Sequence, residues 1–111
     1  MNNFGIILGE PNSINSEILA KSIAFKKKAV IIGNYNLLRS QLKILKINRR
    51  LKKIKKIEEI NKSKNVLCVL DVPLKFKGAF SVNIKQSSVY IKKCLIIGHK
   101  LCIQKKISGI I

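Results

Sequence analysis

The residues best placed for chemistry in this sequence form a polar loop, Gly9 to Glu17, between an apolar run and an amphipathic segment. Free backbone N–H groups at a strand-to-helix junction can hold a phosphate or another anion. The spacing fits neither the dinucleotide pattern G-x-G-x-x-G nor a P-loop, since no Gly-Lys-Ser/Thr follows. From these residues alone, ligand contact and plain capping of the next helix both stay open.

Other side chains give weaker chemical signals. The three cysteines, Cys68, Cys94 and Cys102, form no C-x-x-C pair, and His99 is the one histidine. We therefore predict buried, reduced thiols, no metal site built from this chain alone, and a surface position for His99. Asp71 follows an apolar run, and we interpret it as a turn residue rather than a catalytic one.

The chain is strongly basic, with 23 Lys+Arg against 5 Asp+Glu and a formal net charge of +18. This charge makes nucleic-acid binding one hypothesis, with the stretch from Lys43 to Lys64 as the best local candidate for an anion-binding surface; a solvated face is the alternative. Lysine, isoleucine and asparagine supply 20, 20 and 10 residues, whereas arginine supplies three. Selection for phosphate contacts would favour arginine, so a coding bias towards A and T explains much of the charge.

The rest of the composition narrows the class of protein. Hydrophobic residues make up 47% of the 111 positions, which excludes a disordered polycation and predicts one small folded domain or part of a larger one. No apolar run approaches the roughly 18 residues that a membrane span needs, and the N-terminus carries no basic leader. We therefore expect no membrane association and a cytoplasmic location.

Hydrophobic periodicity places the first half of the chain in alternating strands and helices. Residues 4–8 predict a buried strand, and apolar positions from Ile18 to about Lys27 recur at helical spacing. Residues 29–32 predict a second strand, and residues 37–45 a second amphipathic helix. This alternation indicates an α/β unit with parallel strands.

The second half continues this pattern after an ambiguous stretch. In residues 47–64 the spacing of three from Leu51 suggests a helix, but a ragged edge strand with a loop fits nearly as well. Residues 66–70 predict a buried strand, and residues 87–106 a long helix capped by Ser87 or Ser88. A further strand begins at Ser108, so the sequence ends as if cut short.

Several segments resemble one enzyme family in the same order. The stretch from Gly9 to Ile18 resembles the motif G-[DE]-P-x-G-I-G-P-E of the 4-hydroxythreonine-4-phosphate dehydrogenases of vitamin B6 biosynthesis. Residues 30–38 resemble the family's V-V-G-[DN]-x-x-x-L segment, and residues 69–74 its strand before a long helix. Residues 90–111 are similar to that helix and the strand after it. Ser13, Asn15 and Ser16 stand where the family has Gly, Gly and Pro, although Asn at position 15 tolerates a left-handed turn.

The resemblance implies a fold and a chemistry. The fold would be part of an isocitrate/isopropylmalate-dehydrogenase-like α/β domain, with a mainly parallel sheet flanked by helices, truncated. Residues 1–111 would be the incomplete N-terminal part of a two-domain homodimer. The reaction would be the oxidation of 4-phosphooxy-threonine, a small phosphorylated amino acid, by NAD with a divalent metal. Gly9, Glu10, Pro11, Ser13 and Asn15 would form a loop near the substrate or cofactor.

The same resemblance limits what the chain can do alone. The family's T-G-P-x-x-K motif and its metal-binding histidines would follow Ile111, so we assign no catalytic or metal-binding residue here. We predict that the 111-residue chain is inactive as a dehydrogenase. A small basic nucleic-acid-binding protein is the alternative function, and a remnant without activity is a third hypothesis.

Overall fold

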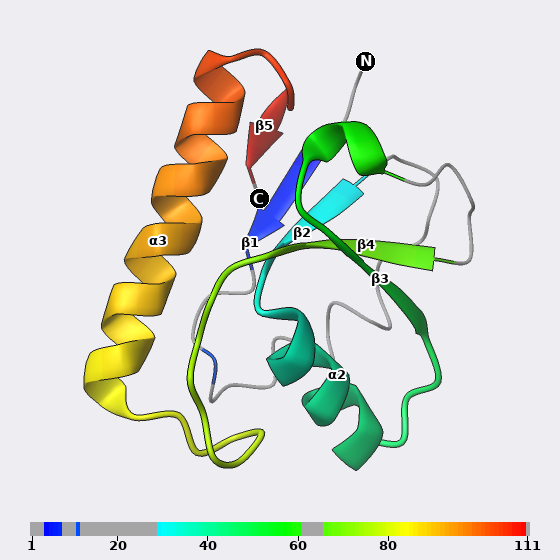
Figure 1. Cartoon of the computed structure of the whole chain (residues 1–111), viewed down its shortest axis with the longest axis vertical. Helices are drawn as coiled ribbons and strands as arrows, with labels where there is room; N and C mark the ends of the chain where they lie inside the picture. Colours follow the sequence, from blue (N-terminus) through cyan, green and yellow to red (C-terminus); the bar gives the residue numbers. More distant parts are fainter. Residues whose placement is uncertain (1–3, 8–10, 12–28, 61–65, 111) are drawn as a thin grey trace.

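Five parallel strands form one sheet in the part of the chain that the computed structural model describes, residues 4–7, 11, 29–60 and 66–110. Within these described ranges, the helices α2 and α3 and a short 3-10 turn lie between the strands (Figure 1). In chain order the elements are β1 Phe4–Ile7, β2 Ala29–Gly33, α2 Tyr35–Ile44, β3 Arg50–Ile54, the 3-10 turn Ile57–Glu59, β4 Val66–Asp71, α3 Ile84–Ile103 and β5 Gly109–Ile110.

The sheet order is β3-β4-β2-β1-β5, which puts the two most apolar strands inside. Val30, Ile31 and Ile32 of β2 are at most 1% exposed, as expected for a parallel strand covered on both faces. β2 pairs with β4 from Val30↔Cys68 to Gly33↔Asp71, so these strands end side by side. The edge strand β3 instead presents lysines to solvent, which discourages pairing with another chain.

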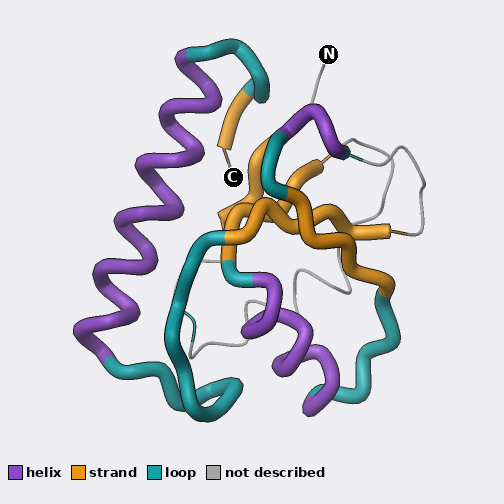
Figure 2. The backbone as a smooth tube through the Cα atoms, viewed as in Figure 1, coloured by secondary structure: helices purple, strands orange, loops and turns teal. Residues whose placement is uncertain are grey.

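The two helices cover opposite faces of the sheet (Figure 2). On one face, Leu38 and Leu42 of α2 pack with alternate strand residues, which are Ile31, Leu67 and Val69. On the other face, α3 contributes Tyr90, Cys94 and Leu101 to a cluster with Val30, Ile32, Cys68 and Leu70. Because successive strand residues point to opposite faces, one apolar run supplies both clusters.

Most of the predicted elements are confirmed with small shifts at their ends. The strands predicted over 4–8, 29–32 and 66–70 correspond to β1, β2 and β4, and the strand expected from Ser108 is β5. The helix predicted over 37–45 is α2, which begins two residues earlier. The helix expected between Ile18 and Lys27 lies outside the described residues.

The ambiguous stretch 47–64 contains an edge strand and a 3-10 turn, so its helical interpretation is wrong. Leu51 packs against the α2 cluster and Ile54 is buried in the α3 cluster, on opposite sides of β3. Their spacing of three therefore reflects the two faces of a strand, not one face of a helix. Pairing of the whole of β3 with β4 fixes this outcome.

The predicted caps of the long helix are also wrong. α3 begins at Ile84 and is capped by Asn83, whose Oδ1 accepts the N–H of Lys85 at 2.9 Å. Ser87 is 3% exposed and lies within the first turns of the helix. Asn is as good a cap as Ser, and the exposed Ile84 concealed this earlier start in the hydrophobic pattern.

Both α2 and α3 are followed by a lysine with a positive φ angle. Lys46 and Lys105 follow the last turns with φ of 56° and 58°, the left-handed region that favours glycine. The next N–H groups close each turn, with Ile47 donating to the Leu42 carbonyl and Lys106 to the Leu101 carbonyl, both at 2.9 Å. These are Schellman motifs in which lysine occupies the glycine position.

We expect Lys46→Gly and Lys105→Gly each to raise the free energy of unfolding by about 1 kcal/mol, because glycine relieves the left-handed strain. Urea titration of each variant measures the change. Lys43→Gly, inside α2, is the matched control and should lower stability by about 1 kcal/mol. A loss of stability in both end variants would show that these lysines are not strained.

Candidate functional site at the carboxyl edge of the sheet

Ligands of parallel α/β sheets bind outside the edge at which the strands end, here called the carboxyl edge. The predicted ligand loop follows β1 at this edge. Of its five predicted residues the structure describes Pro11, which is buried; Gly9, Glu10, Ser13 and Asn15 lie outside the described residues. The structure therefore places one predicted residue here and leaves the rest of the loop as a prediction.

Pro11 is held by Gln41, a polar residue that is 1% exposed on the inner face of α2. The Gln41 side-chain nitrogen donates to the carbonyls of Pro11, at 2.5 Å, and Ala79, at 2.7 Å. It thus ties the loop after β1 to the loop before α3. Our sequence analysis missed Gln41, although its place between Leu38 and Leu42 on an apolar stripe signals a buried polar group.

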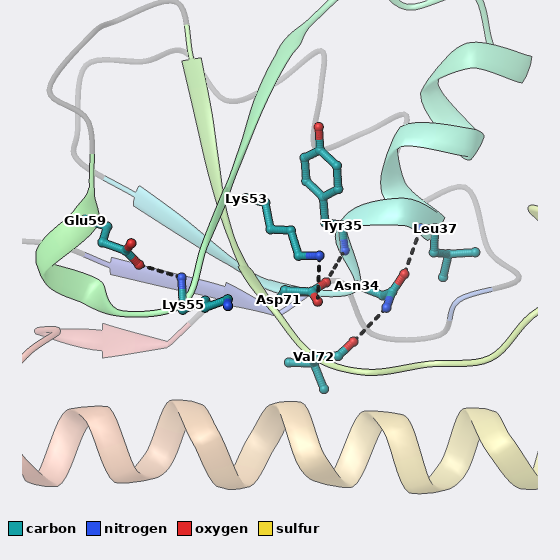
Figure 3. A network of polar contacts seen from close by, with 8 residues as sticks. All are labelled: Asn34, Tyr35, Leu37, Lys53, Lys55, Glu59, Asp71 and Val72. Atoms are coloured by element: carbon teal, nitrogen blue, oxygen red, sulfur yellow. Dashed lines mark hydrogen bonds and ion pairs between the residues drawn. The ribbon is translucent and has the colours of Figure 1, made fainter.

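Asn34 occupies the centre of the carboxyl edge, directly after β2, and is 5% exposed. Its backbone N–H donates to the Tyr90 hydroxyl at 2.7 Å, and its side-chain nitrogen donates to the Val72 carbonyl at 2.8 Å. Its Oδ1 accepts the Leu37 N–H at 2.9 Å and so caps α2 (Figure 3). One residue therefore joins β2, the end of β4, α2 and α3.

Asp71 supports the same helix start from the neighbouring strand. Its Oδ1 accepts the Tyr35 N–H at 2.8 Å, and its Oδ2 lies 3.8 Å from the Lys53 Nζ. A carboxylate at a helix N-terminus is stabilised by the helix dipole. Figure 3 shows the Tyr35 phenol directed away from this carboxylate. The contacts of Asp71 are those of a capping residue, in agreement with a structural role.

A cavity of about 390 Å³ opens beside this network. Pro73, Leu74 and Val89 give it an apolar wall, and the buried Tyr90 joins it to Asn34. Three lysines from two segments, Lys75, Lys85 and Lys93, also line it, and the described lining includes no carboxylate. Such a cavity suits an anion with an apolar part.

Two buried side chains beside this network, Tyr90 and Cys94, hold their protons at neutral pH. Burial raises the pKa of the Tyr90 phenol, so its hydroxyl keeps its proton and accepts the Asn34 N–H through its oxygen. Burial also raises the pKa of the Cys94 thiol to about 11, whereas a reactive cysteine needs a lowered pKa. The local chemistry is therefore binding and positioning.

The remaining candidate residues behave as follows. Cys68 and Cys94 are buried free thiols, as predicted, while Cys102 is half-buried. His99 lies exposed on α3, which confirms its predicted surface position. Within the described residues no three His, Cys, Asp or Glu side chains gather to hold a metal ion, so these residues do not fit a divalent metal by themselves. No described helix is long and apolar enough to cross a membrane.

The pattern G-x-G-x-x-G, which brings a backbone against the pyrophosphate of a dinucleotide, does not occur in the sequence, so the described residues do not fit such a cofactor through that motif.

The parallel sheet with helices on both faces defines a layered α/β protein, which confirms the expected fold class. Solved structures identify the particular arrangement. The chain is similar to a 4-hydroxythreonine-4-phosphate dehydrogenase from Klebsiella pneumoniae, with a TM-score of 0.85 and 21% identity. It is also similar to one from Burkholderia phymatum, with a TM-score of 0.83 and 16% identity.

These likenesses cover 99% of this chain but 35% and 36% of the solved chains, so the chain spans about a third of their length. At such identities they show a shared fold, and they confirm at that level the resemblance found in the sequence motifs. No protein-family model matches the sequence. The search of curated proteins likewise gives no match.

We expect Tyr90→Phe to lower the free energy of unfolding by about 1–3 kcal/mol, because it leaves the buried Asn34 N–H without an acceptor. Tyr35→Phe is the matched control, since the described hydrogen bond of Tyr35 uses its backbone N–H and not its phenol. Urea titration of the two variants makes the comparison. Equal losses in both would contradict the role of the Asn34–Tyr90 bond.

The raised pKa of Cys94 predicts a loss of stability at alkaline pH. The folded state holds this proton up to about pH 11, whereas the thiol of the unfolded chain releases it near its ordinary value of 9.0. The stabilisation is therefore complete below pH 9 and is lost as the pH rises towards 11. We expect the urea midpoint to fall less steeply across this window in Cys94→Ala than in Cys102→Ala. Identical slopes would show that Cys94 does not contribute.

Proposed function

We propose that this chain supplies one α/β portion of a 4-hydroxythreonine-4-phosphate dehydrogenase-like enzyme of vitamin B6 biosynthesis. The observation that carries the proposal is the match of 99% of the chain, at a TM-score of 0.85, to a solved enzyme of that description. The sequence motifs that resemble the family in the same order support it independently of the coordinates. The substrate would be a small phosphorylated amino acid, and the location cytoplasmic.

In this proposal the described residues bind and position, and other residues carry out the oxidation. The carboxyl-edge network holds strand ends and helix starts in place, while the three lysines beside it favour an anionic substrate. NAD would accept the hydride and a divalent metal would polarise the substrate oxygen, at groups that the described residues do not gather. The isolated 111-residue chain should then be inactive.

The outer face of α3 supports an assembly larger than this chain, and a homodimer is the arrangement that the family resemblance implies. Leu95, Ile96 and Ile103 of this face are 50%, 64% and 67% exposed. Exposed apolar residues grouped on one helix face are typical of a surface that packs against further protein. We propose that this face is covered in the active enzyme.

The test compares two samples. The native product, purified from its own cells, is analysed for intact mass and for NADH formation from 4-phosphooxy-threonine with NAD and Mg²⁺. We expect a mass well above 12.5 kDa and NADH formation, and no NADH from the isolated chain under the same conditions. A native product of 12.5 kDa that forms no NADH would overturn the enzyme proposal. NADH formation by the isolated chain would overturn its predicted inactivity.

A further inference from the structure

The outward side of α3 carries one apolar row along most of the helix. Val89, Ile96 and Ile103 recur at intervals of seven residues, which is close to two turns of an α-helix, so their side chains form one line. Each of the three is more than half exposed. The described strands and α2 lie together on one side of α3 (Figure 1). We call this exposed row the α3 seam.

The α3 seam lies opposite the side of the helix that packs on the sheet. Cys94 and Leu101 belong to the buried cluster on the sheet, and they precede Ile96 and Ile103 by two positions. Two positions turn an α-helix by about 200°. The seam is thus a second apolar row, which the packing of α3 on the sheet does not explain. A narrow apolar row with a period of seven is typical of a helix that pairs with another helix.

Lysines flank the α3 seam on both sides. Lys92 and Lys93 follow Val89 by three and four positions, and Lys100 follows Ile96 by four. Residues three and four positions away are surface neighbours of a helical residue and lie on opposite sides of it. The sequence of α3 contains no aspartate or glutamate. The ionic groups beside the seam are therefore all cations.

These charges determine which partner fits the seam. Paired helices choose their partners through the charges that flank the apolar row, and opposite charges attract there. A second copy of α3 is a poor occupant, because it would bring lysines against lysines. A lipid surface is also a poorer fit, because a helix in a membrane surface buries its broad apolar face, and the sheet already covers that face of α3.

We propose that the α3 seam binds an acidic amphipathic helix. Apolar side chains of that helix pack on Val89, Ile96 and Ile103, and its carboxylates lie beside the flanking lysines. The inference rests on the proposed function, in which this face is covered in the active enzyme, and it names the chemistry of the covering partner. NADH formation tests the proposed function and peptide binding tests the seam, so either can fail without the other.

The test measures the binding of three designed peptides of about three heptads each to the 111-residue chain by fluorescence anisotropy. The acidic peptide has leucine along its apolar row and glutamate on both flanks. The basic peptide has lysine in place of glutamate, and the scrambled peptide has the acidic composition without the row. We expect the acidic peptide to bind at least about tenfold more tightly than each of the others.

Ile96→Ser and Ile44→Ser form a matched pair, because the two isoleucines are 64% and 60% exposed on helices and Ile44 lies on α2, outside the seam. We expect the acidic peptide to bind about tenfold more weakly to Ile96→Ser and less than about twofold more weakly to Ile44→Ser. Lys92→Glu and Lys43→Glu test the charge in the same way, with expected losses of about fivefold and less than about twofold. Urea titration checks that each variant is folded.

Each other outcome overturns the proposal. Equal binding of the acidic and scrambled peptides, or equal losses in the two serine variants, would show that general positive charge attracts the peptide. Tighter binding of the basic peptide would contradict the charge argument, and no binding of the acidic peptide at millimolar concentration would exclude the site. Self-association that Ile96→Ser abolishes in sedimentation equilibrium would assign the seam to a second copy. Binding to phosphatidylserine vesicles that Ile96→Ser abolishes would assign it to a lipid surface.

Discussion

The hydrogen bonds of Asn34 are the constraint on which the carboxyl edge depends. When β2 ends, the next backbone N–H has lost its sheet partner while it is still buried, and an unpaired buried N–H is costly. The Tyr90 hydroxyl accepts that N–H, and the Asn34 side chain caps α2 and holds the end of β4. Asn34 thus accepts a backbone N–H at the start of α2 and links α2 and α3 to the end of β2.

A second buried polar residue, Gln41, meets the same kind of constraint. From the buried face of α2, the Gln41 side-chain nitrogen donates to the carbonyls of Pro11 and Ala79 and so links two segments that are distant in the sequence. Buried amides of this kind demand defined geometry, because each unmet hydrogen bond is penalised in a low-dielectric interior. Pro11 and Ala79 are therefore tied to the buried face of α2. The cavity lined by Tyr90 and three lysines results from that arrangement.

Hydrophobic patterns in the sequence predicted the strands and helices whose positions depend on burial. They did not predict the features that depend on strand pairing or on polar contacts. β2 and β4 are continuous apolar runs, so their burial on two faces is plain from composition. The edge strand β3 has lysines and one buried residue, Ile54, and pairing with β4 determines its structure. Tyr90 was assigned to the helix correctly, but its bond to Asn34 spans 56 residues and leaves no local pattern. Lys46 and Lys105 adopt the left-handed conformation in which glycine is usual, so the sequence lacks the glycines that would have indicated the ends of α2 and α3.

The net charge of +18 does not by itself indicate a function, so the positions of the individual basic residues matter more. Lysines occur on β3, on α3 and along the loops, as expected if a coding bias rather than one binding site accounts for most of them. Arg39 and Arg49 are separated by ten positions in the sequence, yet they line one concave surface with Lys43 between α2 and β3. The cavity beside the carboxyl edge is lined by Tyr90, whose hydroxyl accepts the Asn34 N–H, so this cavity adjoins the hydrogen bonds that order the carboxyl edge.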